Sequence, residues 1–267
     1  MIELPIGTSG RHALDIAAAA AHQAGKILRD RFTGQTAVQY KGKGNVVSEA
    51  DLAADAAIRE LLQAEFPDHG LLSEEGETDL EPDGPFTWIV DPLDGSLNYA
   101  TGIGLYSVSV ALAAGNDLVA GALYDPTRDE LFTAAAGRGA FLNGERIAVS
   151  PQPTLDRATI GMDIGYPEES RRQAFDTAVK IRPYIQTVRT LGSSALGLAY
   201  AGCGRFGVYY HFWLFPWDVA AAELIVREAG GLVTDWAGRP VDYRAQAVVA
   251  GSPALHRLFL EAVRAAG

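Results

Sequence analysis

Two aspartates three positions apart, Asp91 and Asp94, are the clearest chemical feature of the sequence. They follow the apolar run 86–90, which predicts a buried strand that ends at Asp91, because Pro92 has no N–H for a sheet ladder. In α/β folds, ligands bind where strands open into loops. Two close carboxylates repel unless one is protonated or a cation lies between them, and a hard divalent metal prefers such oxygens. A surface turn is the competing explanation, because Asp-Pro and Asp-Gly are common turn dipeptides.

Three more acids stand where predicted elements begin or end. Glu74 follows a short predicted strand, Asp51 lies at the start of a predicted helix, and Asp218 opens another helix. Structural explanations exist for each, because Ser48 with Asp51 forms the capping-box pattern and a helix dipole favours an acid at its N-terminus. If these acids share one cleft, they suit a two-metal hydrolase in which Mg²⁺ ions clamp an in-line displacement at phosphorus. Zinc is disfavoured, since the five histidines show no ligand spacing.

The composition is that of an ordinary globular chain. With 267 residues, 48% of them hydrophobic and 21% charged, we expect one large domain or two lobes. A net charge of −11 without a Lys/Arg block argues against nucleic-acid binding. We also expect no membrane span and no secretory signal. The single cysteine, Cys203, cannot form an internal disulfide and lies in an apolar stretch, which favours a cytoplasmic protein and a packing role for its side chain.

The remaining pattern predicts two lobes. An N-terminal, metal-binding α+β lobe over 1–150 would contain helices at 11–32 and 48–65 and a mixed sheet over 71–149. The polar, Gly-rich segment 36–47 is expected to be a mobile loop. Pro151 and Pro153 mark the boundary, and a C-terminal α/β lobe over 151–267 would alternate strands and helices and contribute Asp218.

Three blocks of the sequence resemble the inositol monophosphatase superfamily. They are Ser-Glu-Glu at 73–75, the stretch 88–99 with its Asp-Pro-Leu-Asp-Gly-Ser core, and Trp-Asp-Val-Ala-Ala at 217–221 continuing to Gly-Gly at 230–231. Their order and spacing fit nearly the full chain. The resemblance implies an α/β fold of the α+β type, namely a five-layer αβαβα sandwich with two lobes. It also implies a homodimer that hydrolyses phosphate monoesters with Mg²⁺ and is inhibited by lithium.

The same resemblance implies roles for individual residues. Two or three Mg²⁺ ions would be held by Glu74, Asp91, the carbonyl of Leu93, Asp94 and Asp218. The catalytic residues would be Asp51 and Ser96, which orient or deprotonate the attacking water, and Glu74, which helps to hold the weaker third ion. Substrate contacts would come from the backbone N–H groups of Gly95 and Ser96, and from Lys41, Ser193, Ser194 and His211.

His211 departs from the family pattern. The inositol phosphatases usually have Glu at this position, seven residues before the metal-binding Asp218, and that Glu contacts sugar hydroxyls. The resemblance makes inositol 1-phosphate the leading substrate, and because His211 changes the charge and donor pattern at this position, histidinol phosphate, fructose 1,6-bisphosphate and 3′-phosphoadenosine nucleotides are alternatives within the superfamily. The aromatic run 209–217 lines an altered pocket or, more simply, packs between lobes or subunits. A non-catalytic regulatory dimer is the alternative of another class, and the complete set of acids argues against it.

Overall fold

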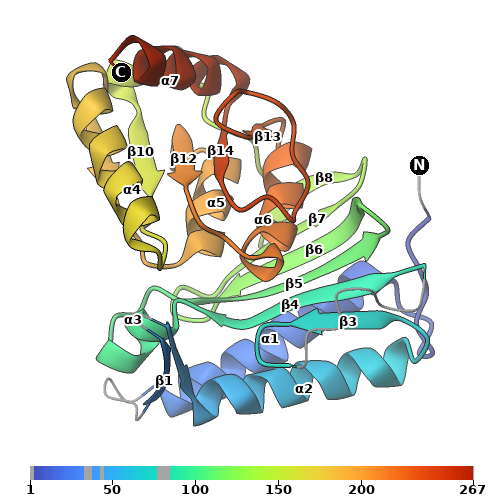
Figure 1. The fold of residues 1–267 in the computed structure, drawn as a ribbon. Helices are drawn as coiled ribbons and strands as arrows, with labels where there is room; N and C mark the ends of the chain where they lie inside the picture. Colours follow the sequence, from blue (N-terminus) through green and yellow to red (C-terminus); the bar gives the residue numbers. More distant parts are fainter. Residues whose placement is uncertain (1–2, 33–37, 43–44, 77–84, 267) are drawn as a thin grey trace.

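The protein is a sandwich of five layers (Figure 1). A computed structural model describes residues 3–32, 38–42, 45–76 and 85–266, with the backbone alone for residues 38, 40–42 and 45. Helices α1 and α2 form the first layer, a seven-stranded sheet the second, α5 and α6 the third, a five-stranded sheet the fourth, and α4 and α7 the fifth. Separate buried apolar clusters fill the spaces between these layers. The predicted αβαβα sandwich is confirmed.

The first sheet is a meander with one parallel edge. Its strands, in spatial and chain order, are β3 (Gly70–Ser73), β4 (Thr87–Asp94), β5 (Ser107–Ala114), β6 (Asp117–Asp125), β7 (Glu130–Ala135), β8 (Gly139–Leu142) and β9 (Glu145–Arg146). Strands β3 and β4 are parallel and the other neighbours are antiparallel. The predicted turn at Asn143-Gly144 has positive φ at both residues, as a tight hairpin requires. This mixed sheet, and the helices α1 (Ala13–Arg31) and α2 (Glu49–Glu65) that cover it, match the prediction.

The prediction of a mobile loop at 36–47 was wrong for those residues of the segment that the structure describes, because they form two paired strands. Residues of β1 (Val38–Gly42) pair antiparallel with those of β2 (Asn45–Ser48), so that Gln39 lies opposite Val47. β-Branched and aromatic residues in both strands favour this pairing over a loop. The pair lies beside the short helix α3 (Ser96–Thr101), at the end of the sheet where β4 terminates (Figure 1). Residues 36–37 and Lys43 lie outside the described residues.

Strand β4 continues past Asp91, where the sequence predicted its end. Asp91 lies opposite Ser109 of β5 and Asp94 lies opposite Ser107, so β4 contains one residue more than its partner over this interval. This is a β-bulge, and it spans Pro92, whose missing N–H makes it compatible with an interrupted ladder. Residues three apart in a regular strand point to opposite faces. The extra residue changes that alternation and lets both carboxylates reach the same site.

The second sheet has the strand order β11-β10-β12-β14-β13. Its strands are β10 (Thr159–Met162), β11 (Thr187–Arg189), β12 (Val208–His211), β13 (Leu232–Thr234) and β14 (Val248–Gly251), and its helices are α4 (Glu168–Ile181), α5 (Ser194–Gly202), α6 (Pro216–Glu228) and α7 (Pro253–Ala265). The predicted alternation of strands and helices is present. The lobe boundary at Pro151 falls between β9 and β10, and the division into two lobes stays a prediction.

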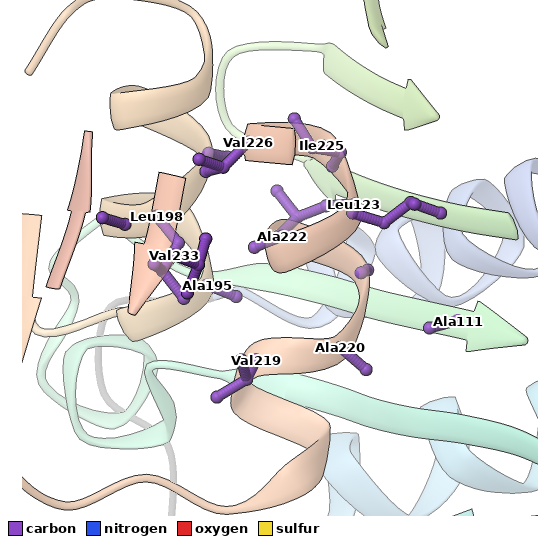
Figure 2. Packing of buried hydrophobic residues seen from close by; sticks show 14 of the residues in the cluster. Ala111, Leu123, Ala195, Leu198, Val219, Ala220, Ala222, Ile225, Val226 and Val233 are labelled. Carbon is purple, nitrogen blue, oxygen red and sulfur yellow. The ribbon is translucent and has the colours of Figure 1, made fainter. Parts of the chain in front are cut away.

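Small residues bring α6 close to the first sheet. A Cβ placed on Gly121 of β6 would lie 3.1 Å from the Cα of Ala221, which is a tight contact, so glycine favours this close approach. Figure 2 shows Ala220 and Ala222 of α6 among the buried side chains, with Leu123 of β6 nearby. Because α6 is fixed against the sheet, its N-terminal turn is fixed relative to the end of β4.

No helix among the described residues is both long enough and apolar enough to cross a lipid bilayer.

Candidate active site

Three aspartates from distant parts of the chain meet at one point. Asp91 and Asp94 come from the end of β4 and Asp218 from the first turn of α6, and a carboxylate oxygen of each lies within 4.8 Å of the others. The Ser109 hydroxyl donates to the carbonyl oxygen of Trp217 at 3.2 Å, which ties the start of α6 to β5 directly opposite Asp91. The predicted convergence of these acids is therefore present in the structure.

Glu74 lies at the edge of the same group. Its backbone N–H donates to the carbonyl oxygen of Val90 at 3.2 Å, which continues the parallel pairing of β3 with β4. Together with the three aspartates, Glu74 lines a cleft of about 500 Å³ that lies at the ends of both sheets. The segment after Glu74, residues 77–84, lies outside the described residues.

Burial and mutual repulsion make Asp91 and Asp218 weaker acids than an exposed aspartate. Burial raises the pKa of Asp91 well above its usual value, and the charges of Glu74, Asp94 and Asp218 raise it further. Burial, followed by repulsion from Asp94, raises the pKa of Asp218 to about 8, although Phe215 donates its backbone N–H to Asp218 at 2.8 Å. A divalent cation among these oxygens would remove both the repulsion and the desolvation cost. The donor set, entirely carboxylate, fits a hard cation such as Mg²⁺.

Asp94 is also the cap of helix α5. One carboxylate oxygen accepts the backbone N–H of Ser194 at 3.1 Å, and the other accepts the backbone N–H of Ala195 at 3.1 Å. The hydroxyls of Ser107 and Ser193 donate to Asp94 as well. Burial raises the pKa of Asp94, and the bonds from Ser193, Ser194 and Ala195 only partly offset that rise. Asp94 therefore joins the first sheet to the central helix layer.

Asp51 and Ser96 lie side by side, as the proposed water-activating pair requires. The Ser96 hydroxyl is 3.1 Å from Oδ1 of Asp51 and 2.8 Å from the carbonyl oxygen of Leu93. Oδ2 of Asp51 accepts the backbone N–H of Ser48 at 3.0 Å, which confirms the predicted capping box of α2. Burial raises the pKa of Asp51 despite these hydrogen bonds. Asp51 thus begins a helix and also contacts the cleft through Ser96.

The remaining predicted substrate residues occupy different places. Gly95 lies at the start of α3 with φ of 91°, and a Cβ there would come within 2.8 Å of the carbonyl oxygen of Leu105. Ser194 lines the cleft, whereas Ser193 is buried behind it against Asp94. Lys41 belongs to β1, and its side chain lies outside the described residues.

His211 ends β12 and lines the cleft with 4% of its surface exposed. The backbone N–H of Trp213 donates to its Nδ1 at 3.0 Å. Burial lowers the pKa of His211 to about 3, so the ring is neutral near pH 7. The sequence prediction that this position borders the pocket agrees with its place in the structure.

Two residues of the cleft were missed from the sequence. Asp163, after β10, accepts the backbone N–H groups of Leu191 and Gly192 at 2.9 and 2.7 Å and the hydroxyl of Tyr209 at 3.1 Å. Burial raises its pKa to about 7. Tyr166 stands near the acids, since desolvation and then the charges of the four cleft carboxylates raise its pKa. Neither residue belongs to a recognisable motif, so only the fold reveals them.

Comparison with known proteins gives a consistent result. The model of the Inositol monophosphatase family matches residues 11–267. Inositol monophosphatase 1 of Solanum lycopersicum is 38% identical over 263 residues, covering 94% of each chain. Inositol-1-monophosphatase of Rhizobium meliloti is 37% identical over 256 residues, covering 94% of this chain and 96% of its own. The crystal structure of the extragenic suppressor protein suhB from Bartonella henselae superposes with a TM-score of 0.89 at 34% identity, covering 94% of this chain and 97% of that one.

Proposed function

The chain belongs to the inositol monophosphatase family, and from that premise we propose that it is a phosphoric monoester hydrolase that acts with Mg²⁺ on a small polyol or sugar phosphate. Inositol 1-phosphate is the leading substrate, in keeping with the names of its relatives. The observation that carries this proposal is the group of Asp91, Asp94 and the partly buried Asp218 beside the Asp51–Ser96 pair.

The metal ligands of this proposal are the cleft carboxylates. Glu74, Asp91 and the carbonyl of Leu93 would hold one Mg²⁺ ion, and Asp91, Asp94 and Asp218 a second, with Glu74 assisting a weaker third. When bound, the metal supplies Lewis-acid chemistry, which favours water as a nucleophile and neutralises charge on the leaving oxygen. The raised pKa values of Asp91 and Asp218 support this assignment, because a bound cation would offset the desolvation and the carboxylate repulsion that raise them.

Asp51 and Ser96 handle the proton of the attacking water. The Ser96 hydroxyl orients the water from its place beside Oδ1 of Asp51, and Oδ1 accepts the proton as the water attacks phosphorus in line. The raised pKa of Asp51 makes it a stronger base than an exposed aspartate. Ser48 holds the other oxygen of Asp51, which keeps the carboxylate aimed at Ser96.

Backbone groups and metal receive the phosphate. No Lys or Arg side chain of the described residues lines the cleft, whose charged lining residues are Glu74, Asp91, Asp94, Asp163 and Asp218. An acidic cleft repels phosphate unless cations reverse the local field. We assign the phosphate to the backbone N–H groups of Gly95 and Ser96 and to the bound ions. Lys41 and Ser194 stay predicted substrate contacts.

Four further properties belong to this proposal. We expect a cytoplasmic homodimer of two-lobed subunits, inhibited by lithium, and the single cysteine supports a reducing compartment. A non-catalytic regulatory dimer is disfavoured, because a binding protein gains nothing from burying several mutually repelling acids beside an aligned hydroxyl.

Phosphate release from inositol 1-phosphate tests the proposal. The purified protein should release phosphate with Mg²⁺ present and stop when EDTA removes the metal. No release from any small phosphate monoester at millimolar Mg²⁺, by a protein with a folded circular dichroism spectrum, would refute it. Release from histidinol phosphate or fructose 1,6-bisphosphate in preference to inositol 1-phosphate would keep the reaction and change the substrate.

A further inference from the structure

Helix α2 carries a second buried aspartate one turn after Asp51. Asp55 is 7% exposed and follows Asp51 by four residues, so the two side chains lie on the same face of the helix. Asp51 contacts the cleft through Ser96 and closes the capping box of α2. Asp55 has no part in either contact. Its burial therefore has another cause, since an aspartate is seldom buried unless it is paired.

Asp55 holds the end of the strand that leads into Glu74. The fully buried Ser73 hydroxyl donates to Oδ1 of Asp55 at 2.5 Å, and Nε of Arg59 donates to Oδ2 at 2.5 Å. Ser73 is the last residue of β3 and immediately precedes Glu74. Asp55 thus connects α2 to the end of β3, in the same way that Asp51 connects α2 to the start of α3.

The turn that contains Glu74 is supported from two sides. The backbone N–H of Gly76 donates to the carbonyl oxygen of Ser73 at 3.3 Å, and that of Glu74 donates to the carbonyl oxygen of Val90 at 3.2 Å. The guanidinium of Arg59 lies against the same turn, because a Cβ placed on Gly76 would fall 1.7 Å from one of its nitrogens. Arg59 therefore supports the turn from the helix side, and Val90 supports it from the sheet side.

On the basis of the phosphatase function above, we propose that Asp55 is a positioning residue for the metal ligand Glu74. Asp55 fixes Ser73, and with it the backbone from which Glu74 reaches the ions, and it holds Arg59 against the turn. A group that orients a metal ligand raises the affinity for the metal, because less conformational freedom is lost on binding. Asp55 does not line the cleft, so it acts through Ser73 and Glu74.

Calorimetric titration with Mg²⁺ tests this role without relying on turnover. The proteins are the wild type, Ser73→Ala, Asp55→Ala and the double variant, each also followed by thermal unfolding in EDTA and by phosphate release. Ser73→Ala removes one hydroxyl and leaves the ion pair of Asp55 with Arg59 in place. The matched control is Ser252→Ala, the same substitution at another buried hydroxyl. Ser252 accepts the N–H of Leu255 at the start of α7 and does not line the cleft.

The expected result is weaker Mg²⁺ binding in both single variants. Ser73→Ala and Asp55→Ala should raise the Mg²⁺ dissociation constant by about 10–100-fold, the range for residues that orient a metal ligand. The double variant should bind Mg²⁺ no more weakly than Asp55→Ala, because both substitutions remove the same contact. The kcat at saturating Mg²⁺ should stay close to that of the wild type. Ser252→Ala should lower the melting temperature and leave the dissociation constant unchanged.

Three results would overturn the inference and leave the phosphatase function standing. The first is an unchanged Mg²⁺ dissociation constant in folded Ser73→Ala, which decides the question even if Asp55→Ala does not fold. The second is a multiplicative effect in the double variant, because Asp55 would then act independently of Ser73. The third is an equal increase in Ser252→Ala, because Mg²⁺ affinity would then follow overall stability. A wild type that neither binds Mg²⁺ nor releases phosphate would refute the proposed function as well.

Discussion

Ser194 donates both its backbone N–H and its hydroxyl to the same oxygen of Asp94, at 3.1 and 3.2 Å, although the two residues lie 100 positions apart. Asp94 therefore has a structural partner on α5 as well as a place among the cleft acids. Asp91 is different, since it accepts the nearby backbone N–H of Leu93 and lies close to the other cleft acids. The two aspartates of one motif are thus expected to affect stability in opposite directions.

Replacing each aspartate by asparagine separates these roles. In the absence of metal and near pH 7, Asp91→Asn should raise the free energy of unfolding, because it removes a buried acid whose pKa is held well above its usual value by burial and by the charges of Glu74, Asp94 and Asp218. Asp94→Asn should lower it by about 1–3 kcal/mol, because an amide NH₂ would face N–H donors of α5. Urea unfolding in EDTA measures both. Equal losses of stability in the two variants would contradict the assignment.

The metal-free protein should lose stability as the pH rises. The pKa of Asp218 is about 8 in the folded protein and near 3.8 when unfolded. Between these values the folded state binds more protons, so its stability is greatest below about pH 4 for this group and falls up to about pH 8. The melting temperature in EDTA should fall over this range, by about 2–4 °C per kcal/mol.

Two controls accompany the pH series. Asp218→Asn should make the fall smaller, while Asp91, Asp163 and Glu223, whose pKa values are also raised by burial, add contributions of the same sign. Saturating Mg²⁺ should reverse the trend, because binding requires the ionised carboxylates. A melting temperature in EDTA that does not change between pH 5 and pH 8 would show that these acids are not destabilised by burial.

Substitutions of Asp51 and Ser96 should have non-additive effects on kcat, whereas their effects on the free energy of unfolding should be independent. Ser96→Ala and Asp51→Asn should each lower kcat by about 10²–10⁴-fold, and the double variant should be no slower than the worse single one. Asp51→Asn should also cost about 1 kcal/mol, because Asp51 closes the capping box of α2. Steady-state kinetics and thermal unfolding of the three variants check this. Multiplicative effects on kcat would show that the two residues act independently.

Asp163 is expected to position the segment that carries Leu191 and Gly192. Asp163→Ala leaves two backbone N–H groups without their acceptor, so stability should fall by about 1–3 kcal/mol and KM should rise. Asp163→Asn can keep both bonds through its carbonyl oxygen and donate to Tyr209, so it should behave nearly as the wild type. Tyr209→Phe serves as the control for the third bond. A larger loss in Asp163→Asn than in Asp163→Ala would show that the negative charge matters instead.

Local features of the fold were predictable because neighbouring residues determine them. The capping box at Ser48 and the turn at Asn143-Gly144 depend on side-chain chemistry and φ preferences within a few residues. The bulge in β4 was not predictable, because the extra residue exists only relative to β5. The pairing of β1 with β2 was missed for a related reason, since the polar, glycine-rich composition suggested a loop and the partner strand decides the outcome.

The residues of the cleft likewise divide into those that the sequence predicted and those that only the fold brings together. The carboxylates of β4 stand out in the sequence, whereas the distances that make them a group depend on where α6 packs. The capping of α5 by Asp94 joins residues 100 positions apart and has no local signal. Asp163 and Tyr166 carry no motif, and only the fold places them in the cleft that contains the acids. Resemblance to the family supplied what local physics could not, namely which distant acids belong together.

The dependence of phosphate release on Mg²⁺, compared between the wild type and Asp91→Asn, tests the central claim most directly. The wild type should hydrolyse phosphate monoesters with a rate that rises from zero to saturation as Mg²⁺ is added. Asp91→Asn, folded and more stable without metal, should lose at least about 10³-fold in kcat/KM and should gain no stability from Mg²⁺. Full Mg²⁺-dependent turnover by Asp91→Asn would contradict the account, because the metal would then bind elsewhere.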